Sequence, residues 1–294
     1  MSPDAVLVIG GDRDPNVHAL LAALAAAGAP VRPLLVGATT RPSVAWDLAD
    51  DRLLVDGIAV APRAAFLRHD VFTQLADPRP APAQRALAWS TALHGWLLAH
   101  PAVRCFNRAA TANNKPHTLV LARALGLAIP RTVVTNHAAT ARAAVGDDPT
   151  RGIAKPVAGG ELTQRLDAAL AAAGDAPVLA APAIVQERLV APEVRVFVVG
   201  DRTLAFEVRS AELDYRASPD VEVVYLGAGP APIAAQVRAL AHQLGLEFAA
   251  ADLKSRADGA LVFLELNTGP MFARFDQACG GELTAAMAAW LLAR

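Results

Sequence analysis

The sequence has few cysteines and almost no net charge, and both features narrow the classes of protein that it can encode. Cys105 and Cys279 are its two cysteines among 294 residues, and no Cys-x-x-Cys spacing occurs. A thiolate zinc site or a thiol–disulfide exchange enzyme is therefore not expected. The 27 lysines and arginines are balanced by 28 aspartates and glutamates, which leaves a net charge of −1. This balance gives no electrostatic reason to expect nucleic acid or a membrane surface as a partner.

Long apolar runs are also lacking, although 54% of the residues are hydrophobic. No uncharged apolar stretch approaches the roughly 20 residues that a membrane-spanning helix needs. The N-terminus carries Asp4 before a short apolar run at 5–9, instead of the basic start and long apolar core of a signal peptide. We therefore expect a cytoplasmic protein without a membrane partner.

Several common catalytic motifs are missing as well. There is no Gly-x-x-x-x-Gly-Lys-Ser/Thr phosphate loop, no His-Glu-x-x-His and no Gly-x-Ser-x-Gly. The seven histidines are scattered without the spacing of metal ligands. The opening Gly10-Gly11-Asp12 is an incomplete dinucleotide fingerprint, so a nicotinamide-dependent oxidoreductase is the least supported enzyme class.

The beginning of the chain alternates strand and helix patterns. Apolar runs at 5–9 and 31–36 flank a helical pattern at 16–27, which Gly28 closes. This order predicts a parallel sheet with helices on its faces. Further elements are expected at 58–60 and 64–67 (strands), 76–83 (a Pro-rich loop), 84–99 (a helix) and 104–106 (a strand).

The rest of the chain reads as an α+β protein rich in hairpins. Its helices are expected at 113–125, 167–176, 232–244 and 284–292. Its strands are expected at 131–135, 152–155, 183–186, 194–199, 204–209, 221–225, 248–254 and 261–267.

An acidic hairpin is the most informative segment. Asp258-Gly259 lies between two strand-like runs and predicts a two-residue turn. Counting outward from that turn places Asp252 directly opposite Glu265. Because strand side chains alternate, Glu265 and Asn267 share a face, whereas Leu264 and Leu266 point to the core.

This hairpin offers three oxygen donors to a cation. Two opposed carboxylates destabilise a hairpin unless a positive charge lies between them, and Mg²⁺ is commonly held by one or two carboxylates together with substrate phosphates. We therefore interpret Asp252, Glu265 and Asn267 as a candidate Mg²⁺ site. The alternative is an ordinary hairpin whose acids are solvated or paired with Lys254.

Basic residues elsewhere suit phosphate groups. Lys155 ends a short apolar run, and the Gly159-Gly160 pair that follows lets backbone N–H groups approach an anion closely. The same pattern is also common in ordinary loops. Lys115 lies near a helix start, where a solvated lysine is the usual case.

Three arginines fall within 22 residues of hairpin-rich sequence: Arg195, Arg209 and Arg216. Burying them without anions would be unfavourable. The alternative to a phosphate site is a set of structural ion pairs with Glu193, Glu207 or Asp214.

Taken in order, these segments resemble the ATP-grasp superfamily, within its RimK-like branch. They are most similar there to the graspetide (microviridin-type) synthetases, which crosslink ribosomal peptides through ester and amide bonds. The resemblance covers essentially the whole chain and is carried by the order and spacing of the motifs. These are Asn114-Lys115, Ile129-Pro130, Lys155-Pro156, Gln186-Glu187-Arg188-Leu189, Val194-Arg195, Glu207-Val-Arg209-Ser210, Asp214-Tyr-Arg216, Asp252, and Glu265-Leu-Asn267.

The resemblance implies a fold and a domain division. An α/β pre-ATP-grasp domain with a parallel sheet would span 1–108. A two-subdomain α+β ATP-grasp fold would follow, with a lid or central subdomain at 109–187 and a C-terminal subdomain with the Mg²⁺-binding hairpin at 188–294.

It also implies roles for individual residues, with ATP and Mg²⁺ as cofactors. Lys115 and Lys155 would contact the ATP phosphates. Gln186, Glu187, Arg188 and Leu189 would hold adenine, and Glu193 the ribose. Arg195, Arg209 and Arg216 would be the catalytic residues that face the phosphates or an acyl phosphate. Asp252, Glu265 and Asn267 would hold Mg²⁺.

The implied activity is ligation of a carboxylate to an amine or a hydroxyl, through an acyl phosphate, on a peptide or an amino-acid-like small molecule. No nucleic-acid partner is implied, and a homo-oligomer is compatible with the family. Two alternatives stay open: a ligase for free amino acids in small-metabolite synthesis, and a nucleotide-binding ATP-grasp protein without ligase activity.

Overall fold

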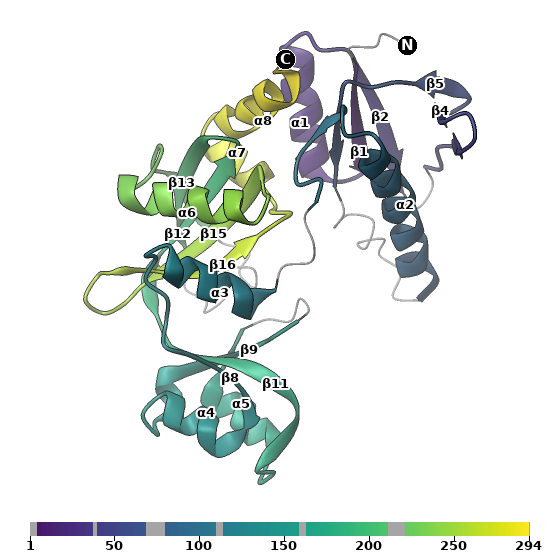
Figure 1. Cartoon of the computed structure of the whole chain (residues 1–294). Coiled ribbons are helices and arrows are strands. Elements are labelled where there is room, and N and C mark those ends of the chain that lie inside the picture. The colour runs from purple at the N-terminus through teal and green to yellow at the C-terminus, as the bar shows by residue number, and fades with distance from the viewer. Residues whose placement is uncertain are drawn as a thin grey trace.

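In a computed structural model of the protein, residues 5–37, 40–68, 80–109, 114–158, 163–210 and 221–293 are described. Figure 1 shows the beginning of the chain on one side, a larger sheet with its helices in the middle, and a smaller sheet at the opposite end. Among the described residues, no helix combines the length and the apolar character that crossing a bilayer requires.

The beginning of the chain forms the predicted parallel sheet. Its strands run in the order β2-β1-β6-β7, and all three neighbouring pairs are parallel. Every residue of β1 is buried, as expected for a parallel strand that is covered on both faces. The elements are β1 (Val6–Gly11), α1 (Pro15–Ala26), β2 (Val31–Val36), β6 (Ala64–Leu67) and β7 (Arg104–Cys105).

A small antiparallel sheet and a long helix complete this part. The strands β3 (Val44–Asp47), β4 (Arg52–Val55) and β5 (Ile58–Val60) form a separate three-stranded sheet. Helix α2 (Pro80–Ala99) begins at Pro80, so the prediction of a loop was wrong for residues 80–83. Proline is tolerated in the first turn of a helix, where its missing N–H would have no partner. Residues 76–79 of the predicted loop lie outside the described part of the chain.

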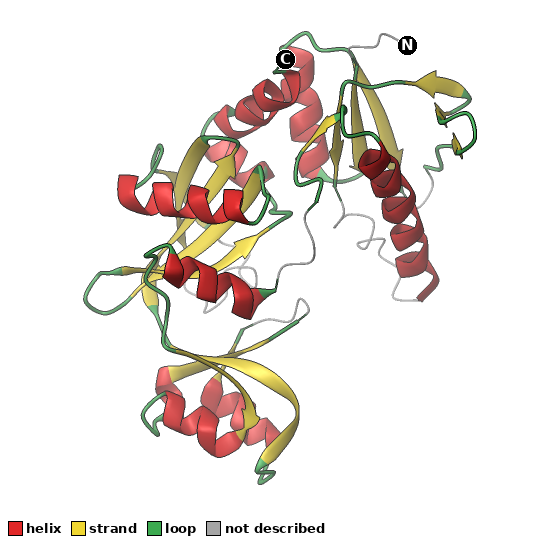
Figure 2. Ribbon diagram, in the orientation of Figure 1, coloured by secondary structure: helices red, strands yellow, loops and turns green. Residues whose placement is uncertain are grey.

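The sheet at the far end of the molecule from the parallel sheet has four strands, in the order β10-β9-β11-β8. It is called the smaller sheet from here on. Helices α4 (Ala138–Ala144) and α5 (Leu166–Ala173) cover one of its faces around a compact core that includes Val145, Leu170 and Val185. Figure 2 shows both helices on the same side of these strands. The other elements are β8 (Thr132–His137), η2 (Pro149–Arg151), β9 (Gly152–Pro156), β10 (Gln164–Arg165) and β11 (Val178–Glu187).

The five-stranded sheet is antiparallel and has the order β14-β13-β12-β15-β16. Helices α3 and α6 pack on one face, around Val196, Ala251 and Leu266. The opposite face carries Phe197 and Phe206, against α7 and α8. The elements are α3 (Lys115–Ala124), β12 (Val190–Val199), β13 (Arg202–Arg209), β14 (Glu222–Tyr225), α6 (Ala231–Gln243), β15 (Phe248–Ser255), β16 (Leu261–Asn267), α7 (Ala273–Ala278) and α8 (Glu282–Leu292).

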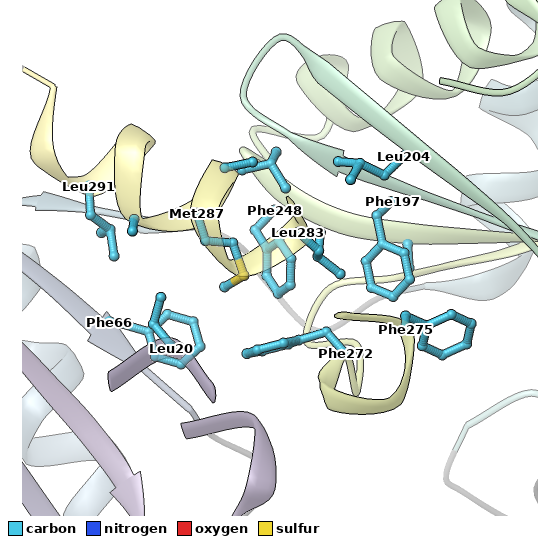
Figure 3. Packing of buried hydrophobic residues seen from close by; sticks show 14 of the residues in the cluster. Leu20, Phe66, Phe197, Leu204, Phe248, Phe272, Phe275, Leu283, Met287 and Leu291 are labelled. Carbon is cyan, nitrogen blue, oxygen red and sulfur yellow. The ribbon is translucent and has the colours of Figure 1, made fainter. Parts of the chain in front are cut away.

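One hydrophobic core joins the parallel sheet to the five-stranded sheet. Figure 3 shows Leu20 and Phe66 packed toward Phe272, with Met287 of α8 above them. The ring of Phe272 meets the rings of Phe66 and Phe248 edge-on, at centroid distances of 6.3 and 5.6 Å. The two sheets therefore share one hydrophobic core, whereas the smaller sheet has a core of its own.

Candidate active site

The hairpin of β15 and β16 brings the acidic residues together as the sequence predicts. Asp252 lies directly opposite Glu265, and Ala250 lies opposite Asn267. Ala251 and Leu266, their neighbours along the strands, are buried against α3 and α6. Because strand side chains alternate, Asp252, Glu265 and Asn267 all belong to the opposite face of the sheet.

The turn itself differs from the prediction, and a β-bulge compensates for the difference. Gly259 N–H donates to the carbonyl of Arg256, and Arg256 N–H donates to the carbonyl of Ala260, so three residues rather than two form the turn. Without correction, this longer turn would place Asp252 opposite Leu264. The bulge between Asp252 and Leu253 absorbs one residue and restores the pairing with Glu265.

The bulge also changes which apolar residue of β16 enters the core. Leu264 is only half-buried, so the prediction that it points into the core was wrong. Phe263 is fully buried in its place, together with Leu266. The extra residue at the bulge interrupts the alternation that a regular strand would follow.

Arg195 neutralises the first carboxylate of the hairpin. It lies opposite Asp252 on β12, and its Nε and Nη2 donate to Asp252 Oδ1 and Oδ2 at 2.6 and 2.8 Å. Asn267 Nδ2 donates to Asp252 Oδ2 at 2.9 Å. Arg195 and Asp252 are each only 6% exposed, and the guanidinium also stands 5.2 Å from the ring centroid of Phe275. Such a two-pronged contact fixes the orientation of both groups.

Lys115 neutralises the second carboxylate. It is the first residue of α3, whose N-cap Asn114 accepts a hydrogen bond from His117 N–H. The Nζ of Lys115 lies 3.5 Å from Glu265 Oε2, and both side chains are about one-fifth exposed (22% and 21%). A predicted phosphate ligand and a predicted metal ligand therefore meet across α3 and β16.

A second charged pair lies beside the first on the same strands. Glu193 pairs with Lys254 across β12 and β15, with 3.0 Å between Lys254 Nζ and Glu193 Oε2. Burial raises the pKa of Glu193 above its ordinary value, and the ammonium of Lys254 opposes that shift. Lys254 is thus engaged with Glu193, whereas the hairpin acids pair with Arg195 and Lys115.

Lys155 and Gln186 share one face of the smaller sheet. Lys155 on β9 lies opposite Ile184 on β11, two residues before Gln186, and both predicted residues are buried. Val185, between Ile184 and Gln186, belongs to the core with α4 and α5. Figure 1 shows these helices on the side of the sheet away from α3. The face with Lys155 and Gln186 is therefore the one turned toward α3 and β16.

Gln186 has one hydrogen-bonding atom to spare. Its Nε2 donates to Thr132 Oγ1 at 3.0 Å. Its Oε1 is buried and has no hydrogen-bond partner among the described residues. An unsatisfied buried acceptor is unfavourable by about 1–3 kcal/mol. This atom would suit an N–H donor of a bound molecule, as the exocyclic amino group of adenine is.

The segment from Glu187 to Leu189 connects the smaller sheet to β12. Glu187 Oε1 accepts hydrogen bonds from Arg256 Nη2 and Nε at 2.8 and 3.1 Å, and from Arg131 N–H at 2.9 Å. Burial would raise the pKa of Glu187, but these hydrogen bonds outweigh it and the pKa is lowered. Arg188 N–H donates to the carbonyl of Arg151 at 2.7 Å, and Leu189 is buried.

Arg209, another predicted arginine, pairs with residues of its own sheet instead of with the hairpin acids. Arg209 pairs with Glu207 at 2.7 Å and with Glu222 at 3.3 Å, with 52% of its side chain exposed. By strand alternation it lies on the face opposite to Phe206 and Val208, which are in the core with Phe197. These contacts correspond to the ion-pair alternative for Arg209. Arg216 lies outside the described residues.

Two arginines with buried or bridging contacts were not singled out from the sequence. Arg256 holds Glu187, and Arg68 contacts the segment after Asn267 through the carbonyl of Gly269. Neither lies in a recognisable motif. Their partners are distant in the chain, so no local spacing of residues reveals the contacts. The proximity of Arg256 to the Asp258-Gly259 turn is the one local feature that could have drawn attention to it.

The donor set of the hairpin fits a hard divalent cation. Within the described part of the chain there is no cluster of three or more His, Cys, Asp or Glu side chains with metal-binding geometry. Asp252 and Glu265 instead provide two carboxylates, beside the amide of Asn267. Mg²⁺ suits such a partial set because phosphate oxygens and water complete its octahedral coordination.

Comparison with known proteins gave matches among solved structures, while no family model and no curated protein matched the sequence. The ATP-grasp ligase PsnB, complexed with a phosphomimetic variant of a minimal precursor, Mg and ADP, is 27% identical over 98% of each chain, with a TM-score of 0.76. The macrocyclase MdnC of Microcystis aeruginosa, bound with the precursor peptide MdnA, is 19% identical over 99% of this chain and all of its own, with a TM-score of 0.76.

A more distant match extends the same fold to another reaction. The D-Ala:D-Ser ligase VanG of Enterococcus faecalis is 17% identical over 98% of each chain, with a TM-score of 0.60. At such identities the likeness concerns the fold alone, whereas PsnB is similar in sequence as well. The chain therefore has the fold of an ATP-grasp ligase over almost its whole length, and it resembles the graspetide synthetases as its motifs predicted.

Proposed function

We propose that the protein is an ATP- and Mg²⁺-dependent ligase that joins a carboxylate of a peptide to an amine or a hydroxyl and releases ADP. The observation that carries the proposal is the convergence of Arg195, Asp252 and Asn267 with the Lys115–Glu265 pair on one hairpin. PsnB, the similar ligase, has been studied with a precursor, Mg and ADP. ATP and Mg²⁺ are both abundant in the cytoplasm, where we expect the protein to act.

The proposal divides the chain at the predicted boundaries. Residues 1–108 form the domain with the parallel sheet, 109–187 the lid or central subdomain, and 188–294 the subdomain with the metal-binding hairpin, against which α3 of the middle segment packs. Support comes from the separate core of the smaller sheet. The segment of Glu187 to Leu189, fastened by Arg256, lies at the proposed boundary between the last two units.

In this proposal the nucleotide lies between the face of the smaller sheet that carries Lys155 and the hairpin. Gln186 and the segment from Glu187 to Leu189 receive adenine, and the unsatisfied Oε1 of Gln186 supports that role. Lys155 and Lys115 hold phosphate oxygens as point charges. Glu193 is paired with Lys254. It therefore binds the ribose in this proposal while one of its oxygens stays in contact with Lys254.

In this reaction the protein positions the substrates and neutralises charge, and none of its side chains acts as the nucleophile. A carboxylate oxygen of the substrate attacks the γ-phosphorus of ATP, ADP leaves, and an acyl phosphate is formed. The lone pair of the amine or hydroxyl then attacks the acyl carbon, phosphate leaves, and the nucleophile loses its proton. Mg²⁺, when held by Asp252, Glu265 and Asn267, would supply a Lewis acid for phosphate oxygens. Arg195 and, in the proposal, Arg216 stabilise the negative charge that builds up during transfer.

Nucleotide titration tests the proposal directly. Isothermal titration of ADP with and without Mg²⁺ should show tight binding that depends on the metal. Glu265→Ala should weaken that binding by about tenfold or more, because one of the metal ligands is lost. Val190→Ala, which changes an exposed residue of β12, is the matched control and should bind as the wild type does. Absence of ADP binding both with and without Mg²⁺ would contradict the proposed function.

The substrate class is tested by ADP release. Peptides with acidic side chains should stimulate it, and free amino acids should not. Stimulation by amino acids alone would favour the alternative of a ligase in small-metabolite synthesis. Binding of Mg²⁺ and ADP without turnover on either panel would favour a nucleotide-binding protein that lacks ligase activity.

A further inference from the structure

The segment that follows Asn267 is held by side chains from the first domain. Asn107, next to β7, donates from Nδ2 to the carbonyl of Thr268 at 2.8 Å. Arg68, next to β6, donates from Nη1 to the carbonyls of Gly269 and Pro270 at 2.7 and 3.0 Å. Asn16, in α1, accepts at Oδ1 from the N–H groups of Phe272 and Ala273 at 2.6 and 2.8 Å.

Two of the three side chains that make these contacts are buried and linked to each other. Arg68 is 4% exposed and Asn16 is 1% exposed. Asp14, the N-cap of α1, lies between them: its Oδ2 is 3.2 Å from Arg68 Nε, and its Oδ1 accepts from Asn16 Nδ2 at 2.6 Å. A buried ion pair is a poor source of net stability, but fully hydrogen-bonded it holds its members in one arrangement. Arg68 and Asn16 are therefore rigid anchors.

These side chains hold the backbone just beyond the end of the sheet. Strand β16 ends at Asn267, opposite Ala250. The next peptide groups are fixed by Asn107 and Arg68 instead of by a strand partner. The side chain of Asn267 is held from the other direction through its contact with Asp252. The orientation of Asn267 thus depends on the first domain as well as on the hairpin.

We propose that Arg68 is a positioning residue for the metal site: it fixes residues 268–270 so that the amide of Asn267 stays beside Asp252. The first domain thereby sets the affinity of the hairpin for Mg²⁺. This proposal rests on the proposed function, because it assumes that Asn267 holds the metal. Groups that orient metal ligands in this indirect way affect metal affinity by about tenfold or more.

The test is the affinity for Mn²⁺, which prefers oxygen ligands as Mg²⁺ does. Free Mn²⁺ is followed by electron paramagnetic resonance in a titration of the full-length protein with ADP present. Arg68→Met should raise the apparent dissociation constant for Mn²⁺ by about tenfold. Arg68→Lys, which keeps the charge but cannot reach Asp14 and both carbonyls with one planar group, should show an intermediate shift.

Arg63→Met is the matched control. Arg63 also joins the first domain to the end of the chain, through its Nη2 and the carbonyl of Leu292 at 2.8 Å, but it does not contact residues 268–273. It should leave the Mn²⁺ affinity unchanged. Thermal unfolding of all three variants shows that each is folded under the titration conditions. Should Arg68→Met fail to fold, Arg68→Lys decides the question.

The outcomes separate this proposal from the proposed function. If the wild type binds Mn²⁺ and ADP, and the Arg68 variants bind both equally well, the positioning role is wrong and the metal site stands. An equal loss in Arg68→Met and Arg63→Met would also overturn it, because the effect would then come from domain contact in general. If the wild type itself binds no Mn²⁺ in the presence of ADP, the proposed metal site fails.

Discussion

At the scale of single residues, the charges of the candidate site are balanced in pairs. Arg195 with Asp252 is a buried pair and Lys254 with Glu193 a largely buried one, whereas Arg209 with Glu207 is exposed. Pairs of these two kinds differ in energy, because a buried charge that loses its partner cannot be solvated. Loss of one member of an exposed pair lowers the free energy of unfolding only slightly, since water solvates the remaining charge.

Substitution of the arginines should reveal this difference. Arg195→Met leaves Asp252 buried without its partner and should lower the free energy of unfolding by about 3–5 kcal/mol. Arg209→Met should leave it nearly unchanged, because its side chain is half exposed. Urea denaturation measures both values. Similar losses for the two variants would show that Arg195 is not a buried partner of Asp252.

At the scale of elements, the connection between the smaller sheet and β12 depends on one carboxylate. Glu187 accepts hydrogen bonds from the side chain of Arg256, at the end of the β15–β16 hairpin, and from the N–H of Arg131, just before β8. Both chain crossings between the two sheets are therefore fastened at the same atom, Glu187 Oε1. This arrangement limits how far the smaller sheet can shift while the contact is intact.

The contribution of Glu187 should depend on pH in a defined direction. Its pKa is lowered from the ordinary 4.5, so its contribution is present above that value and is lost as the pH falls through the folded-state pKa. Glu187→Gln should therefore be less stable than the wild type at pH 7, by about 0.5–1 kcal/mol for a pair that is one-third exposed. The difference should shrink as the pH is lowered below 4.5 in urea denaturation series. In an Arg256→Met background the same substitution should have a smaller effect.

At the scale of the whole molecule, the first domain and the five-stranded sheet share a core. Phe66 of β6 meets Phe272, which in turn meets Phe248 of β15. At the C-terminal helix, Trp290 stacks on Phe106 at 4.2 Å, and the guanidinium of Arg104 lies 4.2 Å from the Trp290 ring centroid. The smaller sheet takes no part in this core. We therefore expect two cooperative units rather than three.

Phe66→Ala tests this division. Truncation of a buried phenylalanine should lower the free energy of unfolding by about 3–5 kcal/mol. Hydrogen exchange should then lose protection in β1 and β12 together, while β9 and β11 keep theirs. Val185→Ala, in the core of the smaller sheet, should produce the opposite pattern. Loss of protection confined to β1 after Phe66→Ala would mean that the first domain unfolds alone.

Most elements of the fold were readable from local patterns, and the exceptions have physical reasons. The loop predicted at 76–83 ends in helix because the prolines at its end occupy a first turn. The pairing of Asp252 with Glu265 was predicted from a turn that proved to be one residue longer, and a bulge cancelled the error. A bulge has no local sequence signal here, because it depends on what the strand packs against. The implied roles of the site residues remain predictions.

The sequence by itself determined the order of most elements, the faces of strand residues wherever the strands alternate regularly, and the presence of a carboxylate pair in one hairpin. Periodicity and turn residues act over a few positions, so these features are local. Only the tertiary structure decided which charge meets which. Arg195 reaches Asp252 across 57 positions of the chain, and Arg68 reaches the carbonyl of Gly269 across 201. Such partners are selected by the packing of whole elements, because several arginines of equal local character compete for the same acids.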